Sequence, residues 1–191
     1  FDFGVLHYRS GDFEAARRSF DAFLRQFPDH APCLEYRARL LHDAGDYPAA
    51  VADFRRLFEL QARPNPGHYI SAAQMLRSLE PDGIDQALAL IDQGDAKLGT
   101  TPQLQRYAME LELARQRPDR AITRLRSLEP LLGESPDWKV DMGELMLEVG
   151  QGDQAATLLD TAALQLDTLR ITPARLALRQ RLEGLRRQLP R

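Results

Sequence analysis

The stretch SGDFEAARRSF at residues 10–20 returns as AGDYPAAVADF at residues 44–54. A glycine, an aromatic residue, an alanine and a phenylalanine keep their places in both copies, and each pair is 34 residues apart. A fixed interval of this length is the signature of a repeat protein, in which one structural unit stacks on the next. The period therefore sets the frame in which the rest of the chain is interpreted.

The alanine of this stretch recurs along the whole chain, at spacings of 34, 37, 34 and 34 residues: Ala16, Ala50, Ala87, Ala121 and Ala155. Four residues after each alanine stands a large apolar side chain: Phe20, Phe54, Ile91, Leu125 and Leu159. A small residue lets two helices approach closely, and a bulky residue one turn later fills the space beside it. The pattern predicts a packing seam in every period.

Each period reads as two helices joined by a short turn. In the second period, Leu34, Ala38 and Leu41 recur at helical steps of four and three residues. Gly45 ends this helix, because glycine adopts the left-handed conformation at low cost. Asp46 follows as a predicted N-cap of the second helix, whose first turn accommodates a proline. A hairpin of this kind cannot bury both faces alone, so copies must stack.

The fold class predicted from this pattern is all-α. The predicted hairpins occupy residues of about 1–30, 31–64, 65–100, 101–134 and 135–171. Pro130 falls late in the second helix of the fourth hairpin, where we expect that helix to stop or kink.

Residues 172–191 predict a terminal capping helix that starts at Thr172 and carries a narrow leucine stripe. Six arginines stand against Glu183 alone in this segment. A basic amphipathic helix can meet a membrane surface or nucleic acid. The stripe is thin and has no aromatic anchor, which favours a capping role instead.

Composition narrows the function classes. The net charge of −3 gives no general attraction to nucleic acid, and no apolar run approaches the roughly 20 residues of a membrane helix. Cys33 is the single cysteine, so no internal disulfide can form. The four histidines lack metal-ligand spacing, and no nucleotide-binding or nucleophile motif appears. We therefore predict no catalytic residue, no cofactor site and no metal site.

The repeated residues resemble the tetratricopeptide repeat family, in its bacterial form, over nearly the whole chain. The first period carries the residues that the family favours at Gly4, Gly11, Phe13, Ala16, Phe20 and Pro28, and the second at Leu34, Ala38, Gly45, Tyr47, Ala50 and Phe54. The third and fourth periods lack the turn glycine before Ala87 and Ala121. The resemblance implies an α-solenoid, a right-handed superhelix of about five hairpins with a C-terminal capping helix.

The resemblance also implies that the first helices line a concave groove that holds a peptide or a helix of a partner protein. Projected onto this chain, the groove residues are Tyr8, Tyr36, Arg39, His42, Arg77, Asp137, Asp141 and Glu144. The family's clamp for the carboxylate tails of chaperones is not matched, since its cationic and amide positions hold Phe1, Val5 and Tyr36.

The function expected from this reading is a non-catalytic scaffold for protein–protein interaction. The alternative is a regulatory or docking arm of a larger polypeptide, such as an enzyme or a secretion or envelope-assembly component, whose remaining part lies upstream. The expected partner is a protein segment, with no nucleic acid and no membrane span. The sequence leaves the cytoplasm and the periplasm equally open, and it leaves the oligomeric state undetermined.

Overall fold

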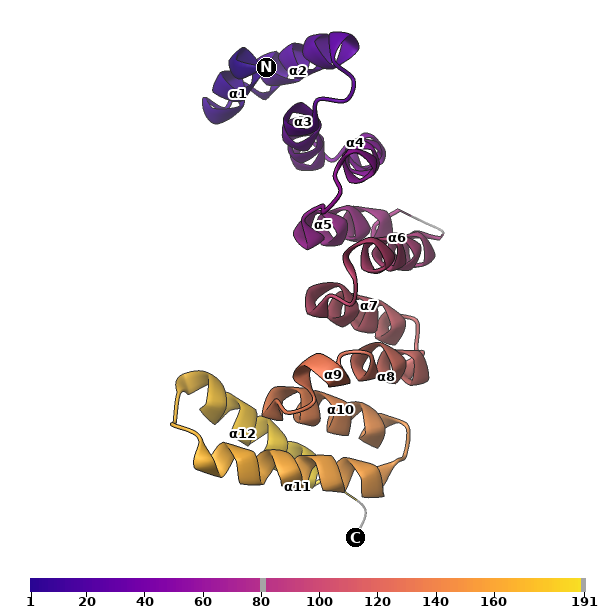
Figure 1. Cartoon of the computed structure of the whole chain (residues 1–191), viewed down its shortest axis with the longest axis vertical. Helices are drawn as coiled ribbons and strands as arrows, with labels where there is room; N and C mark the ends of the chain where they lie inside the picture. Colours follow the sequence, from indigo (N-terminus) through magenta and orange to yellow (C-terminus); the bar gives the residue numbers. More distant parts are fainter. Residues whose placement is uncertain (80–81, 190–191) are drawn as a thin grey trace. The chain divides into compact units, whose positions relative to one another are not determined.

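A computed structural model describes residues 1–79 and 82–189, in which all regular structure is helical (Figure 1). The chain divides into two compact units, residues 1–99 and 100–191. Unit 1 holds α1 (Asp2–Arg9), α2 (Phe13–Gln26), α3 (Ala31–Asp43), α4 (Tyr47–Leu60), α5 (Pro66–Arg77) and α6 (Gly83–Leu98). Unit 2 holds α7 (Pro102–Ala114), α8 (Pro118–Arg126), α9 (Glu129–Leu132), α10 (Pro136–Glu148), α11 (Gly152–Thr168) and α12 (Pro173–Arg186).

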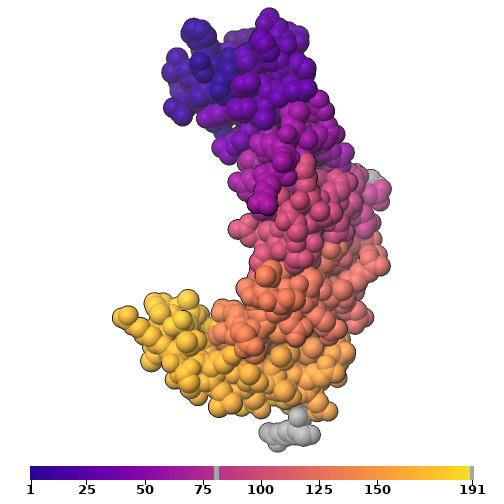
Figure 2. Space-filling model, viewed as in Figure 1, coloured from indigo at the N-terminus to yellow at the C-terminus, as the bar shows by residue number. Residues whose placement is uncertain are grey.

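Consecutive helices pack as antiparallel pairs. In unit 1, α1 packs on α2, α3 on α4 and α5 on α6, and in unit 2, α7 packs on α8 and α10 on α11. Within each unit the second helix of one pair also contacts the first helix of the next, as α2 does with α3. Side chains fill the spaces between the ribbons within each unit (Figure 2). An all-α repeat of helical hairpins is therefore confirmed.

The predicted seam is buried. All five repeated alanines have no exposed surface, and each bulky partner four residues later is at most 2% exposed. The first helix approaches just as closely at Gly4, where an added Cβ would lie 2.5 Å from Cε1 of Phe20. The small residues thus set the distance between the two helices of a hairpin.

The turns inside the first, second, fourth and fifth hairpins use one left-handed residue each. Gly11, Gly45 and Gly150 have φ of 81°, 77° and 76°. In the fourth hairpin, which lacks the glycine, Gln116 takes this conformation with φ of 55°. Its N–H donates to the carbonyl of Leu113 at 2.8 Å, as the N–H of Gly45 donates to that of His42 at 2.9 Å. The same turn therefore forms without its usual residue.

The helix after this turn is short. The helix α8 has 9 residues, whereas α2 and α4 each have 14. It ends at Arg126, and Pro130 lies in the separate short helix α9, so the predicted stop is confirmed. The indole Nε1 of Trp138 in α10 donates to the carbonyl of Leu125 at 2.8 Å, which satisfies a carbonyl at the end of α8.

A partly buried ion cluster joins the first two hairpins. The guanidinium of Arg37 on α3 donates two hydrogen bonds to Asp53 on α4, each 2.7 Å long, and one to Asp21 on α2 at 2.8 Å. Asp53 is only 5% exposed. The hydrogen bonds to Asp53 raise the pKa of Arg37, so the guanidinium stays charged.

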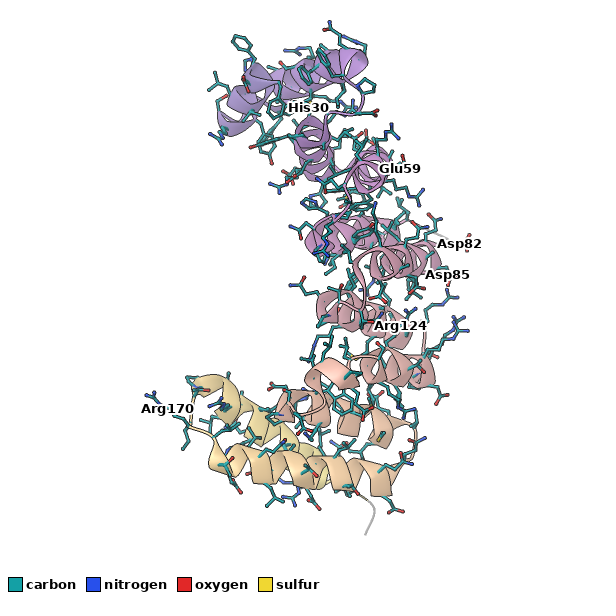
Figure 3. The ribbon with its side chains drawn as sticks, viewed as in Figure 1. His30, Glu59, Asp82, Asp85, Arg124 and Arg170 are labelled. Carbon is teal, nitrogen blue, oxygen red and sulfur yellow. The ribbon has the colours of Figure 1, made fainter. Side chains whose placement is uncertain are left out.

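The terminal helix α12 begins as predicted, with the side chain of Thr172 accepting the backbone N–H of Arg175. Its leucines Leu178, Leu182 and Leu185 pack with the apolar side chains of α10 and α11. Arg175 donates to the carbonyl of Arg170, which lies at the turn between α11 and α12 (Figure 3). The predicted N-cap at Asp46 differs in detail, because its side chain accepts no capping hydrogen bond.

Candidate partner-binding surface

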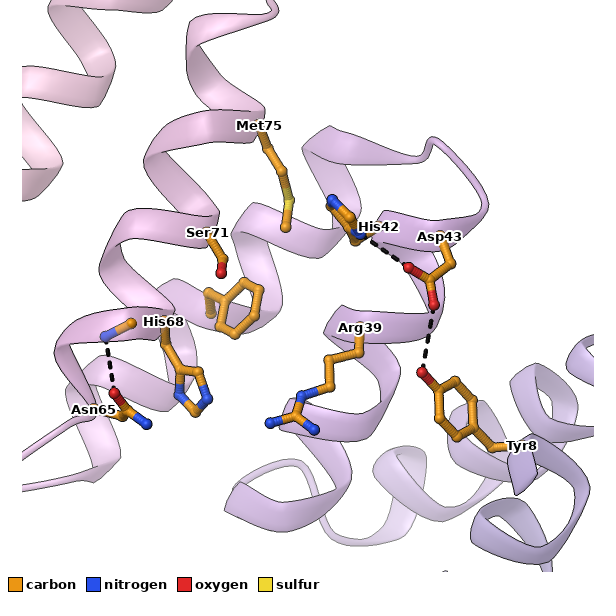
Figure 4. Close-up of a pocket in the computed structure, with 10 residues that line it drawn as sticks. Tyr8, Arg39, His42, Asp43, Asn65, His68, Ser71 and Met75 are labelled. Carbon is orange, nitrogen blue, oxygen red and sulfur yellow. Dashed lines mark hydrogen bonds and ion pairs between the residues drawn. The ribbon is translucent and has the colours of Figure 1, made fainter. Parts of the chain in front are cut away.

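A pocket of about 380 Å³ opens in unit 1 between α3 and α5 (Figure 4). Arg39, His42 and Asp43 come from α3, and His68, Ser71 and Met75 from α5. Tyr8 of α1 and Phe54 of α4 complete the lining together with Asn65 and Gly67. Polar groups thus surround an apolar base formed by Phe54 and Met75, which are both buried.

The α3 side of the pocket carries charge. An Nη2 of Arg39 donates to Oε1 of Glu35, one turn earlier, at 2.5 Å. Asp43 accepts a hydrogen bond from the hydroxyl of Tyr8 at 3.4 Å and lies 3.0 Å from Nδ1 of His42. Burial and the negative charge of Asp43 raise the pKa of Tyr8, so this hydroxyl stays protonated and acts as a donor.

The α5 side is held at the start of its helix. The side chain of Asn65 accepts the backbone N–H of Gly67 at 2.8 Å, which fixes the first turn. His68 lies in that turn, with its Nε2 3.5 Å from Oε1 of Glu35. Its Nδ1 is buried and has no hydrogen-bond partner among the described residues. Burial lowers the pKa of His68, so the ring is neutral near pH 7.

Arg39 of α3 and His68 of α5 therefore both approach the same oxygen of Glu35. A carboxylate or carbonyl oxygen from another molecule can exchange with Glu35, because the Arg39 side chain is about half exposed. The base of Phe54 and Met75 accommodates an apolar stem. The pocket is suited chemically to a side chain with an apolar body and an acceptor at its tip.

The structure brings Tyr8, Arg39 and His42 of the predicted groove together in this pocket. Tyr36 lies close by, with its ring centroid 5.9 Å from that of Tyr8, but it packs against the buried cluster around Phe20 and does not line the pocket. Arg77 is exposed at the end of α5 and also lies outside the lining.

The predicted acidic residues lie on α10 in unit 2, and two of them are ion-paired within the unit. Asp141 accepts a hydrogen bond from Arg106 on one oxygen and from Arg181 on the other, both at 2.8 Å. Arg181 also bonds Glu144. Asp137, in the first turn of α10, accepts the hydroxyl of Ser135 at 3.4 Å. Asp141 and Glu144 are thus already paired with arginines of the same chain.

Sequence reasoning missed the α5 side of the pocket. His68, Ser71 and Met75 recur at steps of three and four residues, so one helix face was visible in the sequence. The family-based projection selected Arg77 instead, since it considers only the groove face and not the face that α5 turns toward α3.

Among the residues that the structure describes, no group of histidine, cysteine and acidic side chains has the arrangement of a metal site. The helices in that part of the chain are too short or too polar to cross a membrane.

Residues 1–65 match the family model described as tetratricopeptide repeat. No curated protein matches the chain by sequence. Among solved structures, MamA is 15% identical, with 90% of this chain and 95% of that chain covered and a TM-score of 0.65. A thermophilic tetratricopeptide repeat protein of Thermus thermophilus is 22% identical, with 95% and 94% covered and a TM-score of 0.53.

YrrB, described as a tetratricopeptide repeat protein with an unusual peptide-binding site, is 15% identical. The match covers 88% of this chain and 90% of the YrrB chain, at a TM-score of 0.57. At these identities the likeness concerns the fold. Residues 1–65 therefore match the tetratricopeptide repeat family by sequence, and the hairpins that follow resemble solved tetratricopeptide repeat structures in fold.

Proposed function

We propose that the chain is a non-catalytic scaffold that binds a segment of a partner protein in the pocket between α3 and α5. The pocket itself is the observation that carries this proposal: Arg39 and His68 line it together with an apolar base, and both also approach one oxygen of Glu35. The peptide-binding site named for YrrB supports it by analogy of fold. The expected partner segment presents an acidic side chain toward Arg39.

The test starts from the partner that the full chain captures in an affinity pull-down. Its affinity is then titrated by calorimetry against the wild type, Arg39→Glu and Tyr36→Ala. We expect Arg39→Glu to weaken binding by about tenfold or more, because an arginine that contacts a partner acid contributes on the order of 1–2 kcal/mol. Tyr36→Ala should have a smaller effect, since Tyr36 supports Tyr8 from outside the pocket lining.

The matched control is Arg18→Glu, which makes the same charge change at an exposed position of α2 outside the pocket. It should alter affinity by less than about twofold, as expected for a screened charge away from the contact. If Arg18→Glu and Arg39→Glu weakened partner binding equally, the loss of affinity would come from the change in net charge, and the pocket would be excluded as the binding surface.

The second candidate is a docking arm of a larger polypeptide that carries catalysis, transport or secretion. It is favoured by the exposed apolar face of α1, where Phe3 and Leu6 are 76% and 62% exposed. In a larger polypeptide a further helix would cover these side chains, and the melting temperature of an upstream-extended chain should rise. An unchanged melting temperature would count against this candidate.

A further inference from the structure

Unit 2 contains a second hollow, of about 310 Å³, between α8 and α9 on one side and α11 on the other. We name it the α10 slot, because its base is formed by Trp138, Met142 and Met146 of α10. Leu158 of α11 extends the apolar lining, and Arg126 and Glu129 stand at the edge. Figure 1 shows these helices together in unit 2. None of these residues belongs to the pocket of unit 1.

The α10 slot is left open by the short α8. In unit 1 the spaces between second helices are crossed by polar contacts. Lys97 of α6 donates to the carbonyl of Phe58 of α4 at 2.5 Å, and Arg17 of α2 lies 3.5 Å from Asp46. Within residues 82–189 no hydrogen bond or ion pair joins α8 or α9 to α11. The slot is therefore unbridged, with an apolar base and with Arg126, Glu129, Gln154 and Thr157 in the rest of its lining.

The edge of the slot carries two opposite charges. Arg126 ends α8 and Glu129 begins α9, and neither makes an ion pair with another described residue. Unpaired charges beside an apolar base favour a ligand that supplies apolar anchors and complementary charges together. A methionine base adapts to differently shaped anchors, and tryptophan is a frequent energetic centre of interfaces.

The walls of the slot limit the backbone of the ligand. Helices on both sides satisfy their own N–H and C=O groups, so they offer no free edge for an extended strand. A segment that buries apolar side chains here must satisfy its own backbone, which a helix does. Trp138 and Met146 are eight residues apart on α10, about 12 Å, which matches anchors spaced two turns apart.

We propose that the α10 slot binds an amphipathic helix of a second protein. Its apolar anchors, at steps of three and four residues, contact Leu158 and the exposed parts of Trp138 and Met146, which are 5% and 6% exposed. An acidic residue beside the anchors pairs with Arg126, and a basic residue pairs with Glu129. This site is separate from the proposed partner pocket of unit 1, and the two proposals stand or fail independently.

The sequence provides internal reporters for this site. Trp138 is the single tryptophan, so intrinsic fluorescence excited in the indole band reports on the base of the slot. The four methionines divide between sites: Met142 and Met146 lie in the slot, Met75 lies in the pocket of unit 1, and Met109 lines neither but packs against the cluster that holds Met142 and Met146. Methyl-labelled methionine therefore distinguishes the two sites in one spectrum.

The probe is a phage-displayed library of amphipathic helices of about 16 residues, a length at which isolated helices begin to be stable. The library is randomised around leucine, methionine or phenylalanine anchors and selected on the full chain. We expect selected peptides to change the Trp138 emission and to shift the methyl signals of Met142 and Met146, while that of Met75 stays in place.

The decisive variant is Gln154→Phe, which places a ring at an exposed position on the slot lining. Its control is Gln93→Phe, the same change at an exposed glutamine that lines a space between α4 and α6. We expect Gln154→Phe to weaken peptide binding at least tenfold and Gln93→Phe to leave it within twofold. Arg126→Glu should shift the selected consensus from acidic to basic beside the anchors.

Three outcomes would overturn the proposal. One is a library that yields no peptide for the folded chain. Another is a set of peptides that shift Met75 alone or bind Gln154→Phe as tightly as the wild type. The third is a Trp138 emission that changes with protein concentration in parallel with dimer formation by sedimentation, since a second copy would then occupy the slot.

Discussion

Replacing Gln116 by glycine should stabilise the chain. Gln116 has φ of 55°, a conformation that costs a residue with a Cβ about 1–2 kcal/mol. Its side chain is exposed, so its removal loses no packing. Glycine also makes the unfolded chain more flexible, which offsets about 0.4–1 kcal/mol of the gain. The net expectation for Gln116→Gly is a stabilisation of roughly 0.5–1 kcal/mol.

The assay is urea unfolding followed by circular dichroism, with the melting temperature as a second readout. For a chain of this size, 1 kcal/mol corresponds to a shift of about 2–4 °C. Gly45→Ala is the reverse control, because an added Cβ there meets nothing within 4 Å and only the backbone penalty changes. It should destabilise by about 1 kcal/mol.

The two changes must have opposite signs if the left-handed residue governs both turns. A loss of stability in Gln116→Gly alongside a loss in Gly45→Ala would refute this reasoning. It would mean that the glutamine side chain supports the turn in a way that outweighs its backbone strain.

Three further changes test the core and its ionisable groups. Ala50→Leu should destabilise by about 1–3 kcal/mol through overpacking, whereas Arg55→Ala on the surface should stay within about 0.5 kcal/mol in urea melts; equal effects would remove Ala50 from the seam. Cys33 is fully buried, and burial raises its thiol pKa to about 11, so labelling by a thiol reagent at pH 8 should proceed only as fast as unfolding; prompt labelling would contradict that burial. Burial lowers the pKa of His68 in the folded chain, so on acidification the unfolded chain takes up this proton first. The neutral His68 therefore contributes fully to stability above about pH 6.5, and this contribution is lost as the pH falls through the folded-state pKa. His68→Gln should therefore show a shallower fall in urea midpoint below pH 6.5, and an identical slope would exclude His68 as the titrating group.

The seam could be predicted from the sequence because it is periodic. Ala16 and Ala155 are far apart in the chain, yet each is buried and is followed four residues later by a buried large apolar side chain. The sequence pattern therefore predicts the packing of these residues directly. The turn at Gln116 could not be assigned with equal ease, since its usual glycine is absent. Its conformation follows from the helices on either side, which must reverse direction within three residues.

The candidate binding surface could be predicted from the sequence only in part. Tyr8, Arg39 and His42 follow the repeat and were predicted, but His68 enters the pocket through the face that α5 turns toward α3. The pairing of Asp141 and Glu144 by Arg181 depends on where α12 lies against α10. Contacts of this kind join side chains about 40 residues apart, for which no local pattern exists.

The ion cluster of Arg37 has a consequence for the order in which unit 1 opens. Releasing α3 from α4 would leave Asp53, which is only 5% exposed, without its partner in a dry environment, and releasing α2 from α3 would take from the guanidinium its hydrogen bond to Asp21. Partial opening at either boundary is therefore disfavoured, and α2, α3 and α4 should exchange their amide hydrogens with solvent deuterium as one cooperative block. In Arg37→Met no cation bridges Asp21 and Asp53. The amide hydrogens of α2 should then exchange faster than those of α4, and the block should divide into its two hairpins.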